Sequence, residues 1–315
     1  MHKLVSIIVT VFNKEKYITR CLRSIDNQTY NKLQVIIVND GSTDNSILKI
    51  NNFIKGKANF EVYSQKNRGP AFARNLGLKY VKGEYIVFID GDDYVSSNFI
   101  EELMNYNSYD LVITGYKQLK NKKIIESIVP NNQVISQKNI STYLFDAAHF
   151  NYCVLVWNKL FKTKIIKENR IAFKDLKLAE DTIFMFDYFR CIHNVKVVDC
   201  TNYFNVVIPD TLSRKMVEEI WSIMLKVEKA GQIDFDYHFN TSWTFLMFKL
   251  IKTALGNYCV NYKEFKQLVY EIRKSSLFNK IKYKKIRYNT DKLIYILIKL
   301  KLTFILDRIF KYRNK

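Results

Sequence analysis

Three carboxylates stand within four positions of the chain, at Asp90, Asp92 and Asp93. They follow a turn at Gly83 and an apolar run at 85–89, the pattern of a buried strand that ends in negative charge. Carboxylates so close repel one another and lose hydration, so they need a compensating cation. Oxygen ligands favour Mg²⁺ or Mn²⁺, and Mg²⁺ typically joins one or two carboxylates to substrate phosphates. The pattern predicts a metal that holds a nucleotide diphosphate; the alternative is an acidic turn that caps the next helix.

The elements that must position these carboxylates alternate between strand and helix. β-branched and apolar runs predict strands at 4–11, 33–38, 60–64, 85–89 and 111–114. Between them, apolar residues at helical spacing, or a preceding cap, predict helices at 15–28, from about 43 to 50, at 71–80 and at 97–106. Such alternation indicates right-handed βαβ units, hence the α/β class with an open, twisted, mostly parallel sheet flanked by helices.

Ligands of such sheets bind beyond the carboxyl ends of the strands. Asn13, Asp40 and the Asp90 cluster all fall at predicted strand ends, so we expect them at one edge of the sheet. The turn that contains Asp40 also supplies Ser42 or Thr43 as a cap for the helix that runs through Ile50.

The rest of the chain is less regular at first and then helical. A polar segment at 117–132 is typical of a hairpin or a mobile loop, and helices are expected near 140–148 and 182–191. From Val217 onward the pattern is helical to the end, which places a boundary near Lys215.

Composition limits the class of protein. The 315 residues are 48% hydrophobic and 25% charged, which is globular. Five widely spaced cysteines without a C-x-x-C pair predict free thiols in a reducing compartment rather than a zinc site or disulfide framework. Neither a signal peptide nor an apolar stretch of ~18 residues is visible, so we expect a cytoplasmic protein.

Positive charge is concentrated in the C-terminal seventh of the chain. The net charge is +20, and the 14 basic and 3 acidic residues of 271–315 contribute +11 of it. The segment 292–306 is too basic to span a bilayer easily, and its apolar face is wide. It is consistent with a helix on an anionic membrane surface, a helix buried against its neighbours with lysines extending outward, or a subunit interface.

Several motifs occur together and in order. They are SIIVTVFN at 6–13, VNDGSTD at 38–44, NRGPAFARNLG at 67–77, the segment 83–93, WNK at 157–159 and the pair Glu180-Asp181. With these motifs, residues 4–215 resemble the family 2 glycosyltransferases of bacterial surface-polysaccharide synthesis. The resemblance implies a GT-A, Rossmann-like fold over 1–215, with a nucleotide-binding half at 1–115 and an acceptor-binding half at 116–215. The basic helical region at 216–315 would follow.

The resemblance implies roles for residues near the nucleotide. Asp40 would accept a hydrogen bond from the uracil imide. The alternative is an Asp-Gly turn with Ser42 capping a helix, and both roles can hold at once. Arg74 would contact the base or the diphosphate, or would be a solvated helix charge. The remaining members of this nucleotide-sugar set are Thr10, Phe12, Asn13, Asp90 and Gly91.

The same resemblance assigns the metal and the chemistry. Asp92 would bind Mn²⁺ or Mg²⁺, with Asp90 near the ribose or metal and Asp93 behind them. Asp181 would act as the general base that takes the proton of the acceptor hydroxyl, and Glu180 would orient it or contact the acceptor. The alternative is that both carboxylates simply begin a helix, where they favour its dipole.

Trp157 and Lys159 would lie near the acceptor or sugar, while Trp157 as ordinary core is an equal alternative. The chain departs from the family pattern after the acidic pair. Thr211-Leu-Ser213-Arg214 lacks the usual upstream aromatic-Arg element, so Arg214 or Lys215 would have to replace that arginine.

The sequence therefore predicts an inverting, metal-dependent transferase that moves a hexose or N-acetylhexosamine from a UDP-sugar to a saccharide acceptor, lipid-linked or protein-linked. Contact with the inner face of the cell membrane through 271–315 fits the basic tail, and a homo-oligomer is left open. A catalytically silent scaffold is one alternative. A nucleic-acid binder is another, disfavoured because acidic residues occupy the predicted ligand edge. A nucleotidyltransferase is a further alternative, but such an enzyme would show a glycine-rich loop with Lys or Arg after its first strand, and this loop is absent from the sequence.

Overall fold

A computed structural model describes residues 3–146, 148–208, 220–235, 241–256 and 261–313. The chain divides into two compact units. The first comprises 1–140, 151–175 and 180–208, and the second comprises 141–150, 176–179 and 209–315. The boundary predicted near Lys215 lies outside the described residues.

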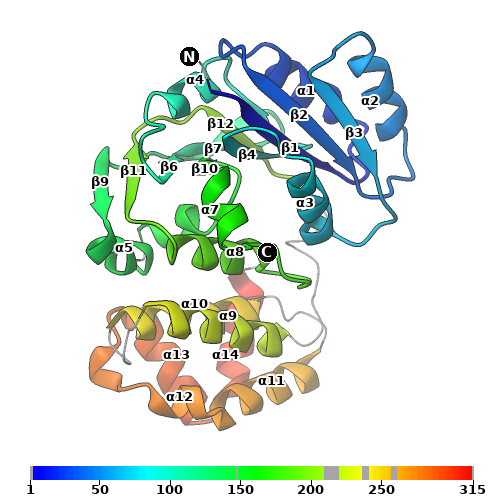
Figure 1. Cartoon of the computed structure of the whole chain (residues 1–315). Helices are drawn as coiled ribbons and strands as arrows, with labels where there is room; N and C mark the ends of the chain where they lie inside the picture. Colours follow the sequence, from blue (N-terminus) through cyan, green and yellow to red (C-terminus); the bar gives the residue numbers. More distant parts are fainter. Residues whose placement is uncertain (1–2, 147, 209–219, 236–240, 257–260, 314–315) are drawn as a thin grey trace. The chain divides into compact units, whose positions relative to one another are not determined.

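An eight-stranded sheet forms the centre of the first unit, in the order β3-β2-β1-β4-β10-β6-β11-β9 (Figure 1). The bounds are β1 Val5–Val11, β2 Leu33–Asn39, β3 Phe60–Ser64, β4 Tyr85–Asp90, β6 Leu111–Thr114, β9 Gln133–Ser136, β10 Lys159–Lys162 and β11 Asn194–Val198. Strands β3, β2, β1 and β4 are parallel to one another, as are β6 and β11, whereas β10 and β9 run antiparallel to their neighbours. The mostly parallel sheet predicted from the sequence is confirmed.

Helices pack on this sheet through small and apolar residues. Figure 1 shows α1 (Ile18–Asp26) beside α2 (Ser46–Ile54), while α3 (Pro70–Lys79) packs on β1 and β2 and α4 (Phe99–Met104) packs on β6 and β10. Gly77 of α3 lies so close to β1 that a Cβ atom there would be 2.6 Å from the Ile8 side chain. The predicted cap at Ser42 or Thr43 is wrong, because α2 begins only at Ser46 and the Asp44 carboxylate accepts the Ser46 N–H at 2.9 Å.

A second sheet was not predicted. It has the order β5-β12-β7-β8, with bounds β5 Tyr94–Val95, β7 Tyr116–Lys120, β8 Lys123–Ile128 and β12 Tyr203–Val206. The polar segment after Tyr116 is therefore the hairpin β7–β8 rather than a loop. Strand β12 pairs with β5, directly after the acidic cluster, and so links this cluster to a segment more than a hundred residues later.

Four further helices occur between β9 and β11 in the sequence, namely α5 Gln137–Leu144, α6 Phe150–Cys153, α7 Thr163–Glu168 and α8 Glu180–Phe189. Helix α8 begins with the acidic pair Glu180 and Asp181, and its apolar side contributes Phe184 and Phe186 to the core.

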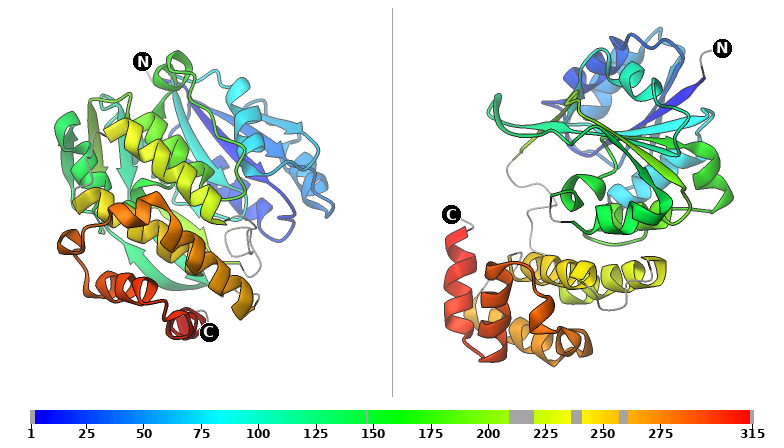
Figure 2. Two further views of the ribbon diagram at one scale, coloured as in Figure 1. Left: turned by 90° about the horizontal axis from the view of Figure 1, so that it is seen from below. Right: turned by 90° about the vertical axis from the view of Figure 1, so that its left-hand side faces the viewer.

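The C-terminal unit contains helices, as predicted, and no strand among its described residues (Figure 2). They are α9 Ile220–Phe235, α10 Thr241–Gly256, α11 Tyr262–Lys274, α12 Ser276–Lys280, the short 3₁₀ turn η2 Tyr283–Lys285, α13 Asn289–Lys299 and α14 Thr303–Arg313. Across the described parts of the chain, every helix is too short or too polar to cross a membrane. Cys21, Cys153, Cys191 and Cys200 are free thiols, and Cys259 lies outside the described residues.

Candidate active site

The carboxyl ends of β1, β2 and β4 meet at one edge of the sheet. The strand register places Thr10 beside Asp90 and Val11 beside Asn39. Beyond the strands, Asp40 N–H donates to Val11 O at 2.8 Å and Gly91 N–H donates to Thr10 O at 3.0 Å. The structure therefore brings the predicted strand-end residues together.

Asp40 anchors the loop that leads into α3. Its Oδ1 accepts hydrogen bonds from Gln65 Nε2 at 2.8 Å and Arg68 N at 2.9 Å, and its Oδ2 accepts one from Gly69 N at 2.8 Å. Gly41 has φ +71°, and a Cβ atom there would be 2.6 Å from Asn67 N, which explains why this position holds a glycine. The loop thus uses both carboxylate oxygens, and the uracil contact of this buried residue stays a prediction.

The β1–α1 loop joins two of the predicted nucleotide residues to the β2–α2 turn. Asn13 has φ +50°, a conformation that asparagine tolerates, and its Oδ1 accepts from Thr43 N at 2.8 Å. The Asn13 N–H donates to Ser42 Oγ at 3.0 Å, so Ser42 serves this loop rather than a helix. Phe12 is half-buried beside them and Thr10 Oγ1 donates to Asp90 Oδ1 at 3.3 Å.

Arg74 is the centre of a buried ionic cluster. Its guanidinium contacts Asp90 Oδ1 at 3.2 Å, Glu180 Oε1 at 3.0 Å and Asp181 Oδ1 at 2.7 Å. The Arg74 side chain is 5% exposed and also lies 5.3 Å from the ring centroid of Phe173. A planar fork of donors suits several carboxylates at once, which a lysine could not match. The alternative of a solvated helix charge is excluded, and a nucleotide contact by Arg74 stays a prediction.

Burial and neighbouring charges set the protonation of Asp181. Burial raises the pKa of Asp181 to about 8, the Arg74 cation opposes this rise, and the negative charges of Glu180 and Asp90 add to it. The side chain nevertheless keeps one-fifth of its surface exposed. A carboxylate with a pKa near the working pH, open on one side and held by a cation on the other, has the properties of a general base.

The other two aspartates of the cluster differ in their partners. Asp92 Oδ2 forms an ion pair with Lys14 Nζ at 2.6 Å, and burial raises the pKa of Asp92 while Lys14 opposes the rise. Asp93 is fully buried and accepts hydrogen bonds from Tyr203 Oη and from Val206 N, both at 2.7 Å. Asp93 thus fastens the end of β4 to β12 and is not aimed at a ligand.

The acidic cluster offers oxygen atoms to a divalent cation. Neither Asp90 Oδ2 nor Asp92 Oδ1 accepts a hydrogen bond from another described residue. No group of three or more His, Cys, Asp or Glu suited to a metal occurs within the described ranges. Two carboxylates plus phosphate oxygens are the usual ligands of Mg²⁺, so the residues fit a metal that arrives with a diphosphate.

The WNK segment belongs to the core. Trp157 is buried and stacks on Tyr203 with ring centroids 4.4 Å apart, which confirms the core alternative. Lys159 is fully buried, with Nζ donating to Tyr152 O and Asn158 Oδ1, both at 2.6 Å, and burial lowers the pKa of Lys159 to about 7. A sugar or phosphate contact of Lys159 would require these bonds to break.

The sequence reasoning missed Lys14 and Tyr203. Lys14 follows Asn13 directly at the carboxyl end of β1, and this position was the signal that could have found it. No local signal marks Tyr203, because its contact with Asp93 spans 110 residues. The segment 211–215, including Arg214 and Lys215, lies outside the described residues.

Comparison with known proteins shows which families and structures this chain is similar to. Residues 6–157 match the model of glycosyl transferase family 2. The chain is 28% identical to the uncharacterized glycosyltransferase EpsJ of Bacillus subtilis (strain 168), over all of this chain and 97% of EpsJ. It is 31% identical to the poly(ribitol-phosphate) beta-N-acetylglucosaminyltransferase TarP of Staphylococcus aureus (strain N315), over 65% of this chain and 63% of TarP. The crystal structure of S. aureus TarS 1–349 with UDP-GlcNAc superposes with a TM-score of 0.73 at 20% identity, covering 99% of this chain and 92% of that one.

The sheet order, the helical C-terminal unit and the acidic strand edge define an α/β protein of the GT-A fold. The chain is a glycosyltransferase, and its residues 6–157, which contain the strand-edge carboxylates, match the family 2 model.

Proposed function

We propose that the protein transfers a hexose or N-acetylhexosamine from a UDP-sugar to a saccharide acceptor, with inversion at the anomeric carbon, in the synthesis of a surface polysaccharide or glycoconjugate. The UDP-GlcNAc in the TarS structure and the activity in the name of TarP support this donor class. The proposal includes a cytoplasmic reaction and an acceptor that is lipid-linked or protein-linked.

One observation carries the proposal. Arg74 joins Asp90 at the nucleotide edge to Asp181 at the start of α8, although these carboxylates are 91 positions apart in the chain. A single buried cation therefore holds the predicted donor site and the predicted base side by side. A purely structural acidic helix start would not need this connection.

Asp181 takes the proton of the acceptor hydroxyl as its oxygen attacks the anomeric carbon. Arg74 opposes the rise in the pKa of Asp181 and so favours its ionised form, and when Asp181 takes up the proton Arg74 remains paired with Asp90 and Glu180. Glu180 thus helps to hold Arg74 in place. Inversion requires the base and the departing UDP to lie on opposite faces of the sugar.

The strand edge binds the donor. Asp40, Thr10, Phe12, Asn13 and Gly91 would contact the uridine, and Asp92 with Asp90 would hold Mn²⁺ or Mg²⁺. When bound, the metal neutralises the charge that develops on the leaving UDP. Lys14 forms an ion pair with Asp92 and adds positive charge beside this carboxylate.

A UDP-release screen over common UDP-sugars, with and without Mn²⁺, tests the proposal, together with calorimetry of UDP binding. We expect turnover of at least one UDP-sugar and its loss in EDTA and in Asp92→Ala. Asp26→Ala, at an exposed carboxylate of α1, is the matched control and should retain activity. UDP binding without turnover of any sugar would favour the silent scaffold, and absence of UDP binding would refute the donor class. Full activity in EDTA would refute the metal dependence of the reaction.

A further inference from the structure

The corner between α13 and α14 exposes apolar side chains that the core does not use. Within α13, Ile294, Leu297 and Ile298 are buried and form its contribution to the core. A second set, one after another along the same segment, faces solvent: Leu293, Ile296, Leu300, Leu302, Phe304 and Ile305. Leu300 is 63% exposed and Phe304 is 56% exposed. Six exposed apolar side chains within thirteen residues indicate an interaction site.

Basic residues alternate with these apolar side chains. Lys299, Lys301 and Arg308 are exposed in the same segment. The only two acidic residues between 276 and 310, Asp291 and Asp307, are buried, and Asp291 is paired with Lys252 at 2.7 Å. The exposed surface is therefore apolar and positive, with no exposed carboxylate in 276–310.

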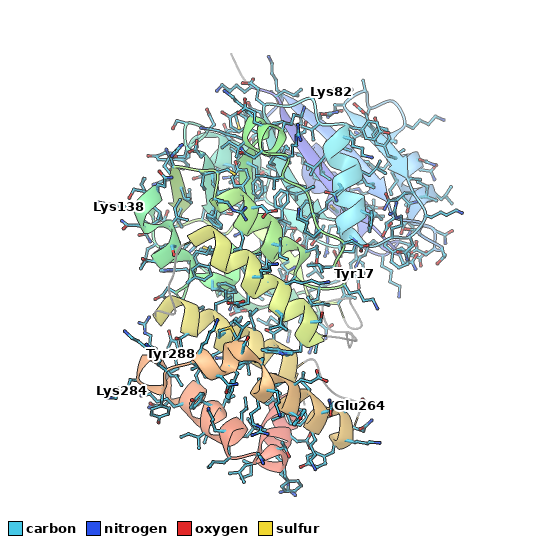
Figure 3. All side chains as sticks on the ribbon, turned by 60° about the horizontal axis from the view of Figure 1, so that its bottom comes forward. Tyr17, Lys82, Lys138, Glu264, Lys284 and Tyr288 are labelled. Carbon is cyan, nitrogen blue, oxygen red and sulfur yellow. The ribbon has the colours of Figure 1, made fainter. Side chains whose placement is uncertain are left out.

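The neighbouring segment extends the positive surface. The rings of Tyr283 and Tyr295 lie 5.9 Å apart, which places 280–287 beside α13. This segment adds exposed basic residues at Lys282, Lys284 and Lys285, whereas Arg287 is paired with Asp146 at 3.0 Å. Figure 3 shows Lys284 on one side of the helical unit and Glu264, an exposed acid of α11, on the other side.

We propose that the α13–α14 surface, defined as residues 292–308 with the basic segment 280–287, binds the anionic phospholipid surface of a membrane. Leucine, isoleucine and phenylalanine enter the boundary between headgroups and acyl chains, while lysine and arginine contact the lipid phosphates. A second copy of the same surface would bring Lys299, Lys301 and Arg308 against like charges, which disfavours it. A nucleic acid would contact the cations but leave Leu293 and Leu300 in water.

Flotation of the full chain with vesicles tests this surface. We expect binding to vesicles of phosphatidylcholine with phosphatidylglycerol and little binding to phosphatidylcholine alone. The double variant Leu300→Glu, Phe304→Glu should lower the partition coefficient at least about tenfold, because it removes apolar contacts and adds negative charge. Lys299→Glu with Lys301→Glu should abolish the preference for phosphatidylglycerol.

The matched control is Leu48→Glu with Ile124→Glu, at side chains that are 56% and 54% exposed in the other unit. It should bind vesicles like the wild type, and all variants should give the same circular dichroism melt. Equal binding by the wild type and the Leu300, Phe304 variant would overturn the proposal. So would a wild-type dimer in light scattering that this variant converts to a monomer, because the surface would then be a subunit interface. The assay contains no nucleotide sugar, so its outcome is independent of the proposed reaction.

Discussion

Around Arg74 the structure buries a cation among three carboxylates, whereas the α13–α14 surface exposes its cations and buries its acids. In the first region each charge has a partner within the fold. In the second region Lys299, Lys301 and Arg308 are exposed to solvent next to apolar side chains. The two regions belong to one chain with a net charge of +20, so the difference lies in placement rather than composition.

The comparison indicates two uses of charge. A buried ion pair contributes little net stability, but it fixes the positions of its members, because removing one partner leaves an uncompensated charge. An exposed cation contributes little to the fold and is free to bind a partner outside it. We therefore expect substitutions near Arg74 to change chemistry and stability, and substitutions at the α13–α14 surface to change binding alone.

The largest effect is expected from Asp181→Asn. Asparagine keeps the shape but cannot take a proton, so kcat should fall about 10³-fold or more, while UDP affinity should change little. Single-turnover UDP release and calorimetry with UDP measure the two quantities. Asp187→Asn, further along α8 and paired with Arg190, is the control and should stay active. If UDP affinity fell instead of kcat, Asp181 would belong to the donor site.

The second test removes the cation of the cluster. Arg74→Met leaves Asp90, Glu180 and Asp181 without their shared partner, and breaking a buried pair costs about 3 kcal/mol or more. The loss should be greatest above about pH 8, because the wild-type Asp181 is then ionised and paired with Arg74, whereas the variant must keep this carboxyl protonated or bury an unpaired charge. Urea unfolding over this pH range measures it. Arg23→Met, at an exposed position of α1, should lower the free energy of unfolding only slightly. If both variants lost the same free energy of unfolding, the burial of Arg74 would not be the cause of the loss.

The Arg74 cluster also shows what a sequence can and cannot predict. Strand runs and the Asp90 motif predicted the parallel strands and their acidic edge, because periodicity and turn residues are local signals. The contacts of Arg74 with Glu180 and Asp181 span 106 and 107 residues, and local patterns carry no information on such distances. The second sheet was missed for the same reason, since β12 pairs with β5 and β7 across long separations.

The surroundings of two lysines could not be predicted from the sequence. The sequence placed Lys159 at a ligand, yet the structure buries it, whereas Lys14 received no role and contacts Asp92. Burial of a lysine depends on the carbonyl and amide oxygens that the fold supplies around it, here Tyr152 O and Asn158 Oδ1. In the C-terminal unit the sequence left three alternatives for 292–306. The exposed positions of Leu293, Leu300 and Phe304 argue against complete burial of that segment.

The pH dependence of the reaction is the third test. Burial raises the pKa of Asp181 to about 8, and the base works in its ionised form, so kcat should rise with pH and level off above this value. Below the pKa the rate should fall about tenfold for each pH unit. A rate profile at saturating donor and fixed Mn²⁺ measures this. A flat profile through this range would show that Asp181 is ionised throughout or is not the base.

A smaller effect is expected where a cation of the fold competes for a site carboxylate. Lys14 Nζ occupies Asp92 Oδ2 at 2.6 Å, so Lys14→Met should free this oxygen and tighten Mn²⁺ binding in the presence of UDP by about tenfold or less. Calorimetry of Mn²⁺ into the UDP complex measures the change. Lys16→Met, two positions later and exposed, should leave the affinity unchanged. Weaker metal binding in Lys14→Met would mean that this ammonium supports the site instead of competing for it.

The smallest effect concerns the helical unit itself. The Asn261 side chain caps α11 by accepting the Glu264 N–H at 3.0 Å, and Asn261→Ala should cost about 1 kcal/mol of stability. Lys266→Ala, on the exposed side of the same helix, should be neutral, and Asn261→Ser should restore most of the loss. Thermal unfolding followed by circular dichroism measures these values. Because a cap acts on the backbone and not on the surface charge, Asn261→Ala should leave vesicle binding intact. If the variant lost vesicle binding as well as stability, the α13–α14 surface would depend on the order of α11.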